Sequence, residues 1–316
     1  MKKIINVVYP PITSFPHYAG PLSLIYNYDN AKTWFYNSYI QLYTDFRHID
    51  RGEIKFRQEF LNFPFINICG IEDYRLLFGK DNLIFNLKNI INENIAVATN
   101  LDRYFITSYK QQEHLIHPAY FYGYDDDNQL FYISDFVSSG KFIFTDISYK
   151  SFMESVYIMD DLDYKFKNSS KKYFLSLYYI NDREYNFSIN KLYKELLDYY
   201  NCQNTIDSDD IKMFYKLTDD VKWGLAVYDW FMEYISEFGK TDYCESTIDH
   251  RIAYIINDHK KAMLLRLEYM QDKKYITNGD NLIKDYNDLY INSNILLNLC
   301  LKYNSNHSNN TIERML

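Results

Sequence analysis

Hydrophobic and polar positions follow two different patterns along the chain, and the change falls near residue 185. Before it, short apolar or aromatic runs bounded by turn-forming residues predict β-strands at 95–99, 119–124, 130–133, 141–144 and 172–180. After it, apolar residues at three- and four-residue spacing predict helices over 187–201, 220–238, 246–272 and 279–302. We therefore expect an α+β domain over 1–185 and an all-helical domain over 186–316.

The clearest local pattern runs from His117 to Asp135, where two aromatic and apolar runs flank an acidic turn. This arrangement predicts a β-hairpin. His117 stands at the start of the first strand and Asp135 at the end of the second, with the turn about midway between them. Antiparallel pairing would bring the two side chains within hydrogen-bonding reach. Such a pair is the orienting half of a nucleophile–His–Asp triad.

The N-terminal region is expected to be extended as far as Tyr18, because prolines keep their predecessors out of helix. A helix is predicted to start next, with Pro21 in its first turn. A nucleophile at such a helix start would benefit from the helix dipole and from free backbone N–H groups, which lower a thiol pKa and form part of an oxyanion hole. Ala19 occupies that position. Residues 50–70 look irregular, a helix is predicted over 71–91, and the tail over 304–310 is expected to fray.

Composition narrows the functional classes. With 316 residues, 47% hydrophobic positions, 34 Tyr and 22 Phe, the chain can bury a large core. A net charge of -8 and the lack of a basic stripe argue against nucleic-acid binding. No apolar run has the length of a membrane span, and the N-terminal apolar stretch is too short for a secretion signal. Four scattered cysteines without a Cys-x-x-Cys pair favour a reduced, cytoplasmic protein without structural metal, and no cofactor is expected.

Two motifs carry a resemblance to known enzymes. Ala19-Gly20-Pro21-Leu22-Ser23 resembles the Cys-Gly-Pro-x-Ser/Ala motif that opens the first helix in papain-fold enzymes of the bacteriocin-peptidase-like and phytochelatin-synthase-like groups. His117 through Gly123-Tyr124-Asp125, followed by Asp135, resembles their histidine strand and the aspartate after it. The segment 95–104 is similar to the one before the histidine in the N-terminal domain of the butirosin acyltransferase family. The resemblance covers about residues 9–180.

The C-terminal helices resemble helical tails on papain-fold proteins of thiotemplate, or carrier-protein, biosynthetic clusters, a group that includes amide-forming proteins of closthioamide assembly. The resemblance implies a papain-like domain with an antiparallel sheet, and an acyltransferase or amide synthetase activity. The acyl donor would be an acyl or peptidyl carrier-protein thioester and the acceptor a small amine. An acidic carrier would need a basic patch, for which Lys260, Lys261 and Arg266 are candidates. The C-terminal helices are a candidate homodimer interface.

The resemblance also assigns roles to residues. A cysteine at position 19 would be the nucleophile, His117 the general base and Asp135 the residue that orients the imidazole. The family often places a Gln side chain of the oxyanion hole about six residues before the cysteine, where this chain has Thr13.

One departure decides the chemistry: a methyl group at Ala19 cannot attack a thioester. Either a cysteine was replaced to give an inactive variant, or the chain is a natural pseudoenzyme. The retained Gly20-Pro21, His117 and Asp135 favour the first explanation. A cysteine peptidase of the same fold and a non-catalytic binding or scaffold protein remain alternatives. Cys69 is the strongest rival nucleophile, although its apolar surroundings favour an inert core thiol, and the acidic turn at 125–127 is expected to be solvated.

Overall fold

The structure, a computed structural model, describes residues 1–46, 52–58, 63–109, 111–137, 140–161, 174–204, 220–238, 240 and 247–316. Its contacts divide the chain into two compact units. Unit 1 comprises Met1–Ala31 and Phe63–Glu184, and unit 2 comprises Lys32–Asn62 and Tyr185–Leu316. The fold is mixed α+β with an antiparallel sheet. Residues 32–62, which the sequence analysis placed in the first domain, therefore belong to the second unit.

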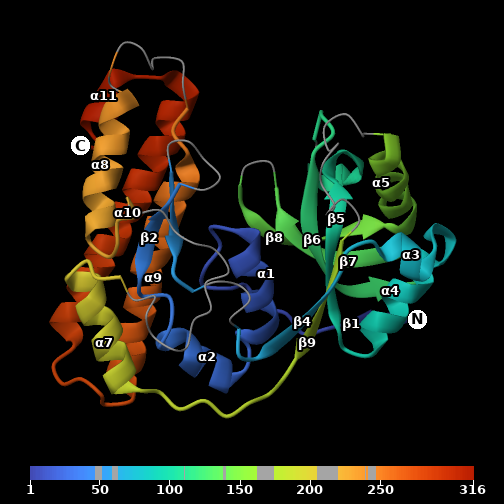
Figure 1. Ribbon diagram of the computed structural model, residues 1–316, viewed down its shortest axis with the longest axis horizontal. Helices are drawn as coiled ribbons and strands as arrows, with labels where there is room; N and C mark the ends of the chain where they lie inside the picture. The colour runs from blue at the N-terminus through green and yellow to red at the C-terminus, as the bar shows by residue number, and fades with distance from the viewer. Residues whose placement is uncertain are drawn as a thin grey trace. The chain divides into compact units, whose positions relative to one another are not determined.

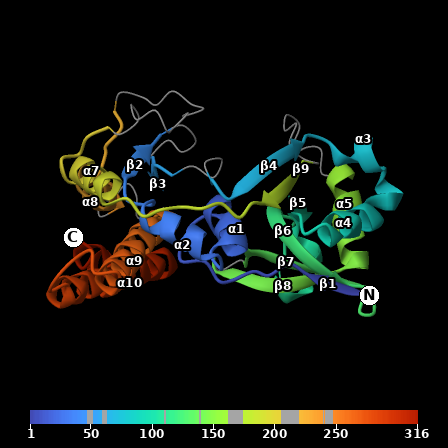
Figure 2. The ribbon, with the colours of Figure 1, turned by 90° about the horizontal axis from the view of Figure 1, so that it is seen from below.

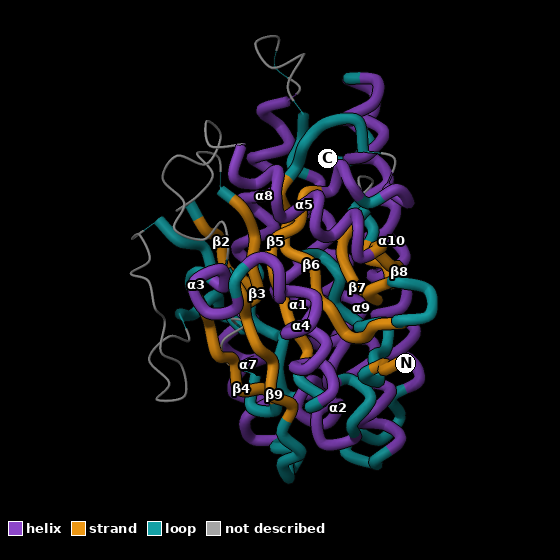
Figure 3. The backbone as a smooth tube through the Cα atoms, turned by 90° about the vertical axis from the view of Figure 1, so that its right-hand side faces the viewer, coloured by secondary structure: helices purple, strands orange, loops and turns teal. Residues whose placement is uncertain are grey.

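Unit 1 is built on one antiparallel sheet. Its strands are β1 (Lys2–Ile4), β4 (Ile66–Ile71), β5 (Ala96–Asp102), β6 (Ile116–Asp125), β7 (Leu130–Phe136), β8 (Phe142–Ser148) and β9 (Leu175–Ile180). They follow the order β4-β9-β5-β6-β7-β8, and β1 pairs with β6 as well. Figure 3 shows this succession of strands from β4 to β8. The predicted hairpin is confirmed as β6 and β7.

Helices cover both faces of this sheet. The helix α1 (Pro16–Ile25) lies on one face, and α3 (Tyr74–Phe78), α4 (Leu83–Asn92) and α5 (Tyr149–Asp161) lie on the other side (Figures 1 and 2). Side chains alternate between the faces, as the pleat of a strand requires. Phe136 and Phe142 pack with Ala19 of α1. Phe121 and Phe131 pack edge-to-face against Phe152 of α5 instead.

The first helix begins earlier than the sequence indicated. Pro16, not Pro21, occupies its first turn, where a missing N–H costs no hydrogen bond. The N–H groups of Tyr18 and Ala19 already donate to the carbonyl of Phe15. Pro21 therefore lies inside α1, and Ala19 is the helix's fourth residue.

Residues 63–92 also differ from the expectation. The run predicted to be irregular ends in a strand, β4, which pairs with β9 along its whole length. The predicted helix over 71–91 is divided into α3 and α4, and Gly79 follows α3 with a φ of 68° that an L side chain rarely adopts. A Gly with positive φ ends a helix without steric cost, which explains the break.

Unit 2 consists of helices with one small sheet. Its helices are α7 (Ile189–Tyr200), α8 (Ala226–Phe238), α9 (His250–Asp272), α10 (Asp280–Asn306) and α11 (Asn309–Glu313), and α2 (Asp29–Tyr36) crosses the boundary between the units. The strands β2 (Leu42–Asp45) and β3 (Glu53–Phe56) pair with each other. Helices α9 and α10 pack along one another (Figure 1). The tail predicted to fray, 304–310, is helical except at residues 307 and 308, and Thr311 and Ile312 after it are buried.

Two buried side chains of α9 tie the segment after α2 to unit 2. Arg266 donates from Nε to the carbonyl of Tyr36 at 2.7 Å and from Nη2 to the carbonyl of Ser38. The ring of His259 lies with Nε2 2.9 Å from the carbonyl of Ile40. Because an unpaired buried carbonyl is costly, these bonds stabilise the packing of residues 36–40 on α9. Among the described residues, no helix is long and apolar enough to cross a membrane.

Candidate active site

His117 and Asp135 meet at the end of the hairpin. His117 is the second residue of β6 and Asp135 the last but one of β7. Their Nδ1 and Oδ1 atoms are 2.8 Å apart, the carboxylate is buried, and a quarter of the histidine side chain is exposed. The strand register and an irregularity near Gly123 determine this meeting, since the two residues are not directly opposite in the ladder. The pair has the geometry of a base and the residue that orients it.

Two further side chains hold the same carboxylate. Arg103, in the 3-10 turn η3 (Arg103–Phe105) after β5, donates from Nη2 to Oδ1 of Asp135 at 2.9 Å and from Nε to Oδ2 at 3.2 Å. The hydroxyl of Tyr109, in the turn η4 (Thr107–Tyr109), donates to Oδ2 at 3.2 Å. The backbone N–H of Phe136 donates to Oδ1. Sequence reasoning singled out neither Arg103, which lies in the segment 95–104, nor Tyr109, because nothing local shows that these side chains reach Asp135.

The imidazole of His117 uses its two nitrogens differently. Nδ1 lies near Asp135, near the carbonyl of Pro118 at 3.0 Å and near Nη2 of Arg103 at 2.7 Å. No described residue forms a hydrogen bond with Nε2. That nitrogen is therefore the one available to a substrate or a nucleophile.

Ala19 and His117 have a common neighbour, the ring of Phe136. Ala19 is fully buried in a cluster with Phe136 and Phe142. Asp135 and Phe136 are consecutive in β7, so their side chains leave the strand on opposite faces. The ring of His117 contacts both: it bonds Asp135, and its centroid lies 6.5 Å from that of Phe136. His117 thus lies between its carboxylate partner and the aromatic residue that covers position 19.

The backbone around position 19 does not match the predicted oxyanion hole. The expected free N–H is absent at Ala19, because this group donates to the carbonyl of Phe15 at 2.9 Å. The cause is the early helix start at Pro16, which gives the N–H of residue 19 a carbonyl four residues earlier, that of Phe15. Thr13, half-buried, lies two residues before Phe15, which caps the helix.

Gly20 has a packing role of its own. A Cβ on this residue would overlap ring atoms of Tyr120, a buried side chain of β6. Burial raises the pKa of Tyr120 well above its ordinary value. The backbone of α1 therefore rests directly on the strand that carries His117, and only glycine permits this approach.

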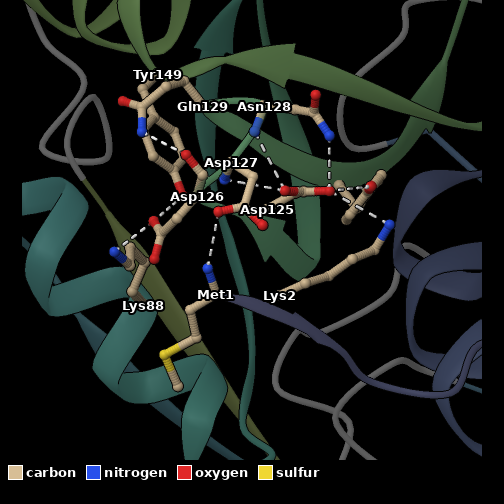
Figure 4. Close-up of polar contacts among 10 residues, drawn as sticks. Met1, Lys2, Lys88, Asp125, Asp126, Asp127, Asn128, Gln129 and Tyr149 are labelled. Atoms are coloured by element: carbon tan, nitrogen blue, oxygen red, sulfur yellow. Dashed lines mark hydrogen bonds and ion pairs between the residues drawn. The ribbon is translucent and has the colours of Figure 1, made fainter.

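The acidic turn between β6 and β7 is solvated at Asp127, as expected, but Asp125 and Asp126 are held by ion pairs (Figure 4). Asp125 is buried, and a hydrogen bond from the side chain of Asn128 helps to hold its pKa at about 2, below the ordinary 3.8. Lys2 pairs with Asp125 at 3.3 Å, and Lys88 pairs with Asp126 at 2.5 Å. Each of these two carboxylates has its own cation, and no group of metal-binding side chains occurs among the described residues. The turn closes the hairpin.

A second histidine–carboxylate pair lies close in sequence to the first. Nδ1 of His114 is 2.5 Å from Oδ2 of the buried Asp102. The same carboxylate accepts hydrogen bonds from the N–H groups of Tyr104 and Leu115. These bonds cap η3 and fix the start of β6, so a structural role accounts for the pair.

Two other predictions about side chains are wrong. Cys69 is exposed on β4, not buried in the core, because the strand turns its side chain outward. Arg266 is buried, and Lys260 bonds the hydroxyl of Tyr228 at 2.7 Å within the helices. Burial lowers the pKa of Lys260 to about 8. These two residues therefore do not form an exposed basic patch with Lys261.

Comparison of the chain with models of known protein families gave no match, and comparison with curated protein sequences gave none either.

Proposed function

We propose that unit 1 is a papain-like acyl-transfer domain in which position 19 is the site of the nucleophile, His117 the base and Asp135 the residue that orients it. With cysteine at that position, the protein would be an amide-forming acyltransferase of a natural-product pathway in the cytoplasm. It would take an acyl chain from an acyl or peptidyl carrier-protein thioester and pass it to a small amine. With Ala19 the chain cannot perform this reaction. We propose no membrane or nucleic-acid partner. We do propose that the protein forms a homodimer through its C-terminal helices.

One observation supports this assignment most: His117 contacts both the buried Asp135 and Phe136, which packs on Ala19. Its Nε2 is free of described partners, as a general base requires. The ring is therefore oriented by a carboxylate, and it shares one neighbour, Phe136, with position 19.

The proposed reaction has two acyl transfers. Nε2 of His117 would take the thiol proton as sulfur attacks the thioester carbonyl, and the imidazolium would return that proton to the departing carrier thiol. The amine would then attack the acyl-enzyme and give a proton to Nε2, which passes to the released cysteine sulfur. Aromatic side chains around position 19, including Phe136 and Phe142, would limit access of water to the intermediate. Thr13 is the proposed oxyanion-hole side chain.

The test restores the nucleophile. Ala19→Cys protein incubated with an acyl-N-acetylcysteamine thioester should gain the mass of the acyl group on residue 19, and Ala19 protein should not. Adding an amine should release amide, whereas release of free acid alone would indicate a hydrolase, the peptidase alternative. The matched pair of controls is Ala19→Cys with His117→Ala, which should lose the adduct, and Ala19→Cys with His114→Ala, which should keep it. No adduct on folded Ala19→Cys protein with short and long acyl chains would refute the proposal.

A second candidate is a non-catalytic protein that binds a carrier protein or peptide. It is favoured by the buried methyl of Ala19 and by the N–H of residue 19, which is already bonded to Phe15. If the source gene encodes alanine at position 19, this candidate describes the natural chain. The protein with Ala19 should then bind the carrier protein in calorimetry, without turnover.

A further inference from the structure

Lys260 of α9 has phenols as neighbours instead of carboxylates. Its Nζ donates to the hydroxyl oxygen of Tyr228 in α8 at 2.7 Å and lies 4.5 Å from the centre of that ring. Tyr199 of α7 donates its own hydroxyl to the same oxygen at 3.1 Å. Among the residues that the structure describes, no carboxylate forms an ion pair with Lys260. Three helices of unit 2 therefore bring one amine and two phenols together.

This environment favours the neutral amine of Lys260. A desolvated ammonium group without a negative partner is costly, since a phenol and an aromatic ring replace its hydration only in part. Burial accordingly lowers the pKa of Lys260 to about 8. At pH 7 about one such amine in ten is then neutral, compared with about one in 2,500 for an ordinary lysine with a pKa of about 10.4. Only the neutral amine has a lone pair that can attack a carbon atom.

The other titratable groups of the cluster are uncharged at neutral pH. Burial raises the pKa of the phenols of Tyr199 and Tyr228, and also that of Tyr286 in α10. The ring of His259 stacks on Tyr199 at 5.0 Å, and burial lowers its pKa well below the ordinary value. Lys260 and Tyr228 are only half-buried, whereas Tyr199 is buried. The partly exposed amine thus has a protonated phenol beside it, which can donate to a leaving group.

We propose that Lys260 is a nucleophilic lysine that condenses with a small aldehyde to form an imine. The lone pair of Nζ attacks the carbonyl carbon, and a proton moves from nitrogen to the former carbonyl oxygen to give a carbinolamine. The Tyr228 hydroxyl gives its proton to the departing hydroxyl group, which leaves as water while nitrogen forms the C=N double bond. The proton left on nitrogen returns to the Tyr228 oxygen. The sum is amine plus aldehyde to imine plus water, and it does not depend on the acyl transfer proposed for unit 1.

The test is reductive trapping on the unaltered chain. Propanal and sodium cyanoborohydride convert each imine into a stable propylamine, and peptide mass spectrometry gives the initial rate of labelling at each lysine. Lys261, its half-buried neighbour on α9, is the internal reference, because the ratio of the two rates cancels the effects of pH on propanal and on the reductant. At pH 7 Lys260 should be labelled at least about tenfold faster than Lys261. This ratio should fall between pH 8 and 10, where an ordinary lysine becomes increasingly neutral.

Two tyrosine variants distinguish a reactive lysine from one that is merely buried. Tyr228→Phe keeps the ring but removes the hydroxyl that transfers the proton, so the ratio at pH 7 should fall several-fold. Tyr193→Phe, at an exposed position of α7, should leave the ratio unchanged. A rate at Lys260 equal to or below that at Lys261 at pH 7, or a ratio that Tyr228→Phe leaves unchanged, would overturn the proposal. If Tyr228→Phe does not fold, the ratio in the unaltered chain and its dependence on pH decide the question.

Discussion

Substituting Gly20 by alanine tests the closest contact between α1 and the sheet. A Cβ at residue 20 would lie within 2.5 Å of Cε1 of Tyr120 and nearer still to two other ring atoms. The favourable separation of two carbon atoms is about 3.5 to 4.0 Å. Either the helix or the ring must move by about 1 Å, and the ring is buried and bonded to Tyr178. Overpacking of this kind costs about 1 to 3 kcal/mol.

The net effect follows from two opposing terms. We take the upper value for the clash, about 3 kcal/mol, because three ring atoms overlap at once. Alanine is a better helix former than glycine by about 1 kcal/mol. A net loss of about 2 kcal/mol remains, which lowers the unfolding temperature of a domain of this size by about 4 to 8 °C.

Differential scanning calorimetry of Gly20→Ala measures this change. The matched control is Gly70→Ala, since a Cβ on Gly70 of β4 meets nothing within 4 Å. That variant should unfold at or slightly above the temperature of the unaltered chain. Tyr120→Leu combined with Gly20→Ala should recover part of the loss by making room for the methyl group. An unfolding temperature for Gly20→Ala equal to or above that of the unaltered chain would refute the packing argument.

Two other variants test the anchoring of the loops. Arg266→Met leaves the carbonyls of Tyr36 and Ser38 without donors. Calorimetry should therefore show that the free energy of unfolding falls by about 2 to 4 kcal/mol. Lys261 is a half-buried neighbour on the same helix, and Lys261→Met should change this free energy little. The depressed pKa of Asp125 means that its stabilising contribution is complete above pH 3.8 and lost as the pH falls through about 2. Asp125→Asn should therefore be less stable than the unaltered chain at pH 6 and equally stable near pH 2 in thermal melts; a constant difference across that range would contradict this reasoning.

The hairpin could be predicted because its signals are local. Alternating aromatic residues, a turn rich in Asp and Asn, and the positions of His117 and Asp135 all lie within nineteen consecutive residues. Pairing of those two strands then brings the side chains together. The predicted start of α1 was wrong because two prolines are suitable for that position. Pro16 and Pro21 both suit a first turn, and sequence alone does not show which one takes it.

Arg103 and Tyr109 could not be predicted for a different reason. Their contacts with Asp135 span 32 and 26 residues and depend on how the turns after β5 fold back over β7. Arg266 was misjudged for the same kind of reason, since a charged residue on a long helix is usually exposed. Its burial depends on the carbonyls of Tyr36 and Ser38, more than 200 residues away.

These contacts change how strongly Gly20, Asp135 and His117 each support an enzymatic function. Gly20 is explained by the ring of Tyr120, so its presence does not require catalysis. Asp135 would be satisfied without a histidine, because Arg103, Tyr109 and the N–H of Phe136 already hold it. His117 is the partner that this buried carboxylate does not need, and it is partly exposed. Its Nε2 has no hydrogen-bond partner among the residues that the structure describes. His117 is therefore the residue that most supports the proposed acyl-transfer chemistry, and the comparison of His117→Ala with His114→Ala in the Ala19→Cys protein is the decisive measurement.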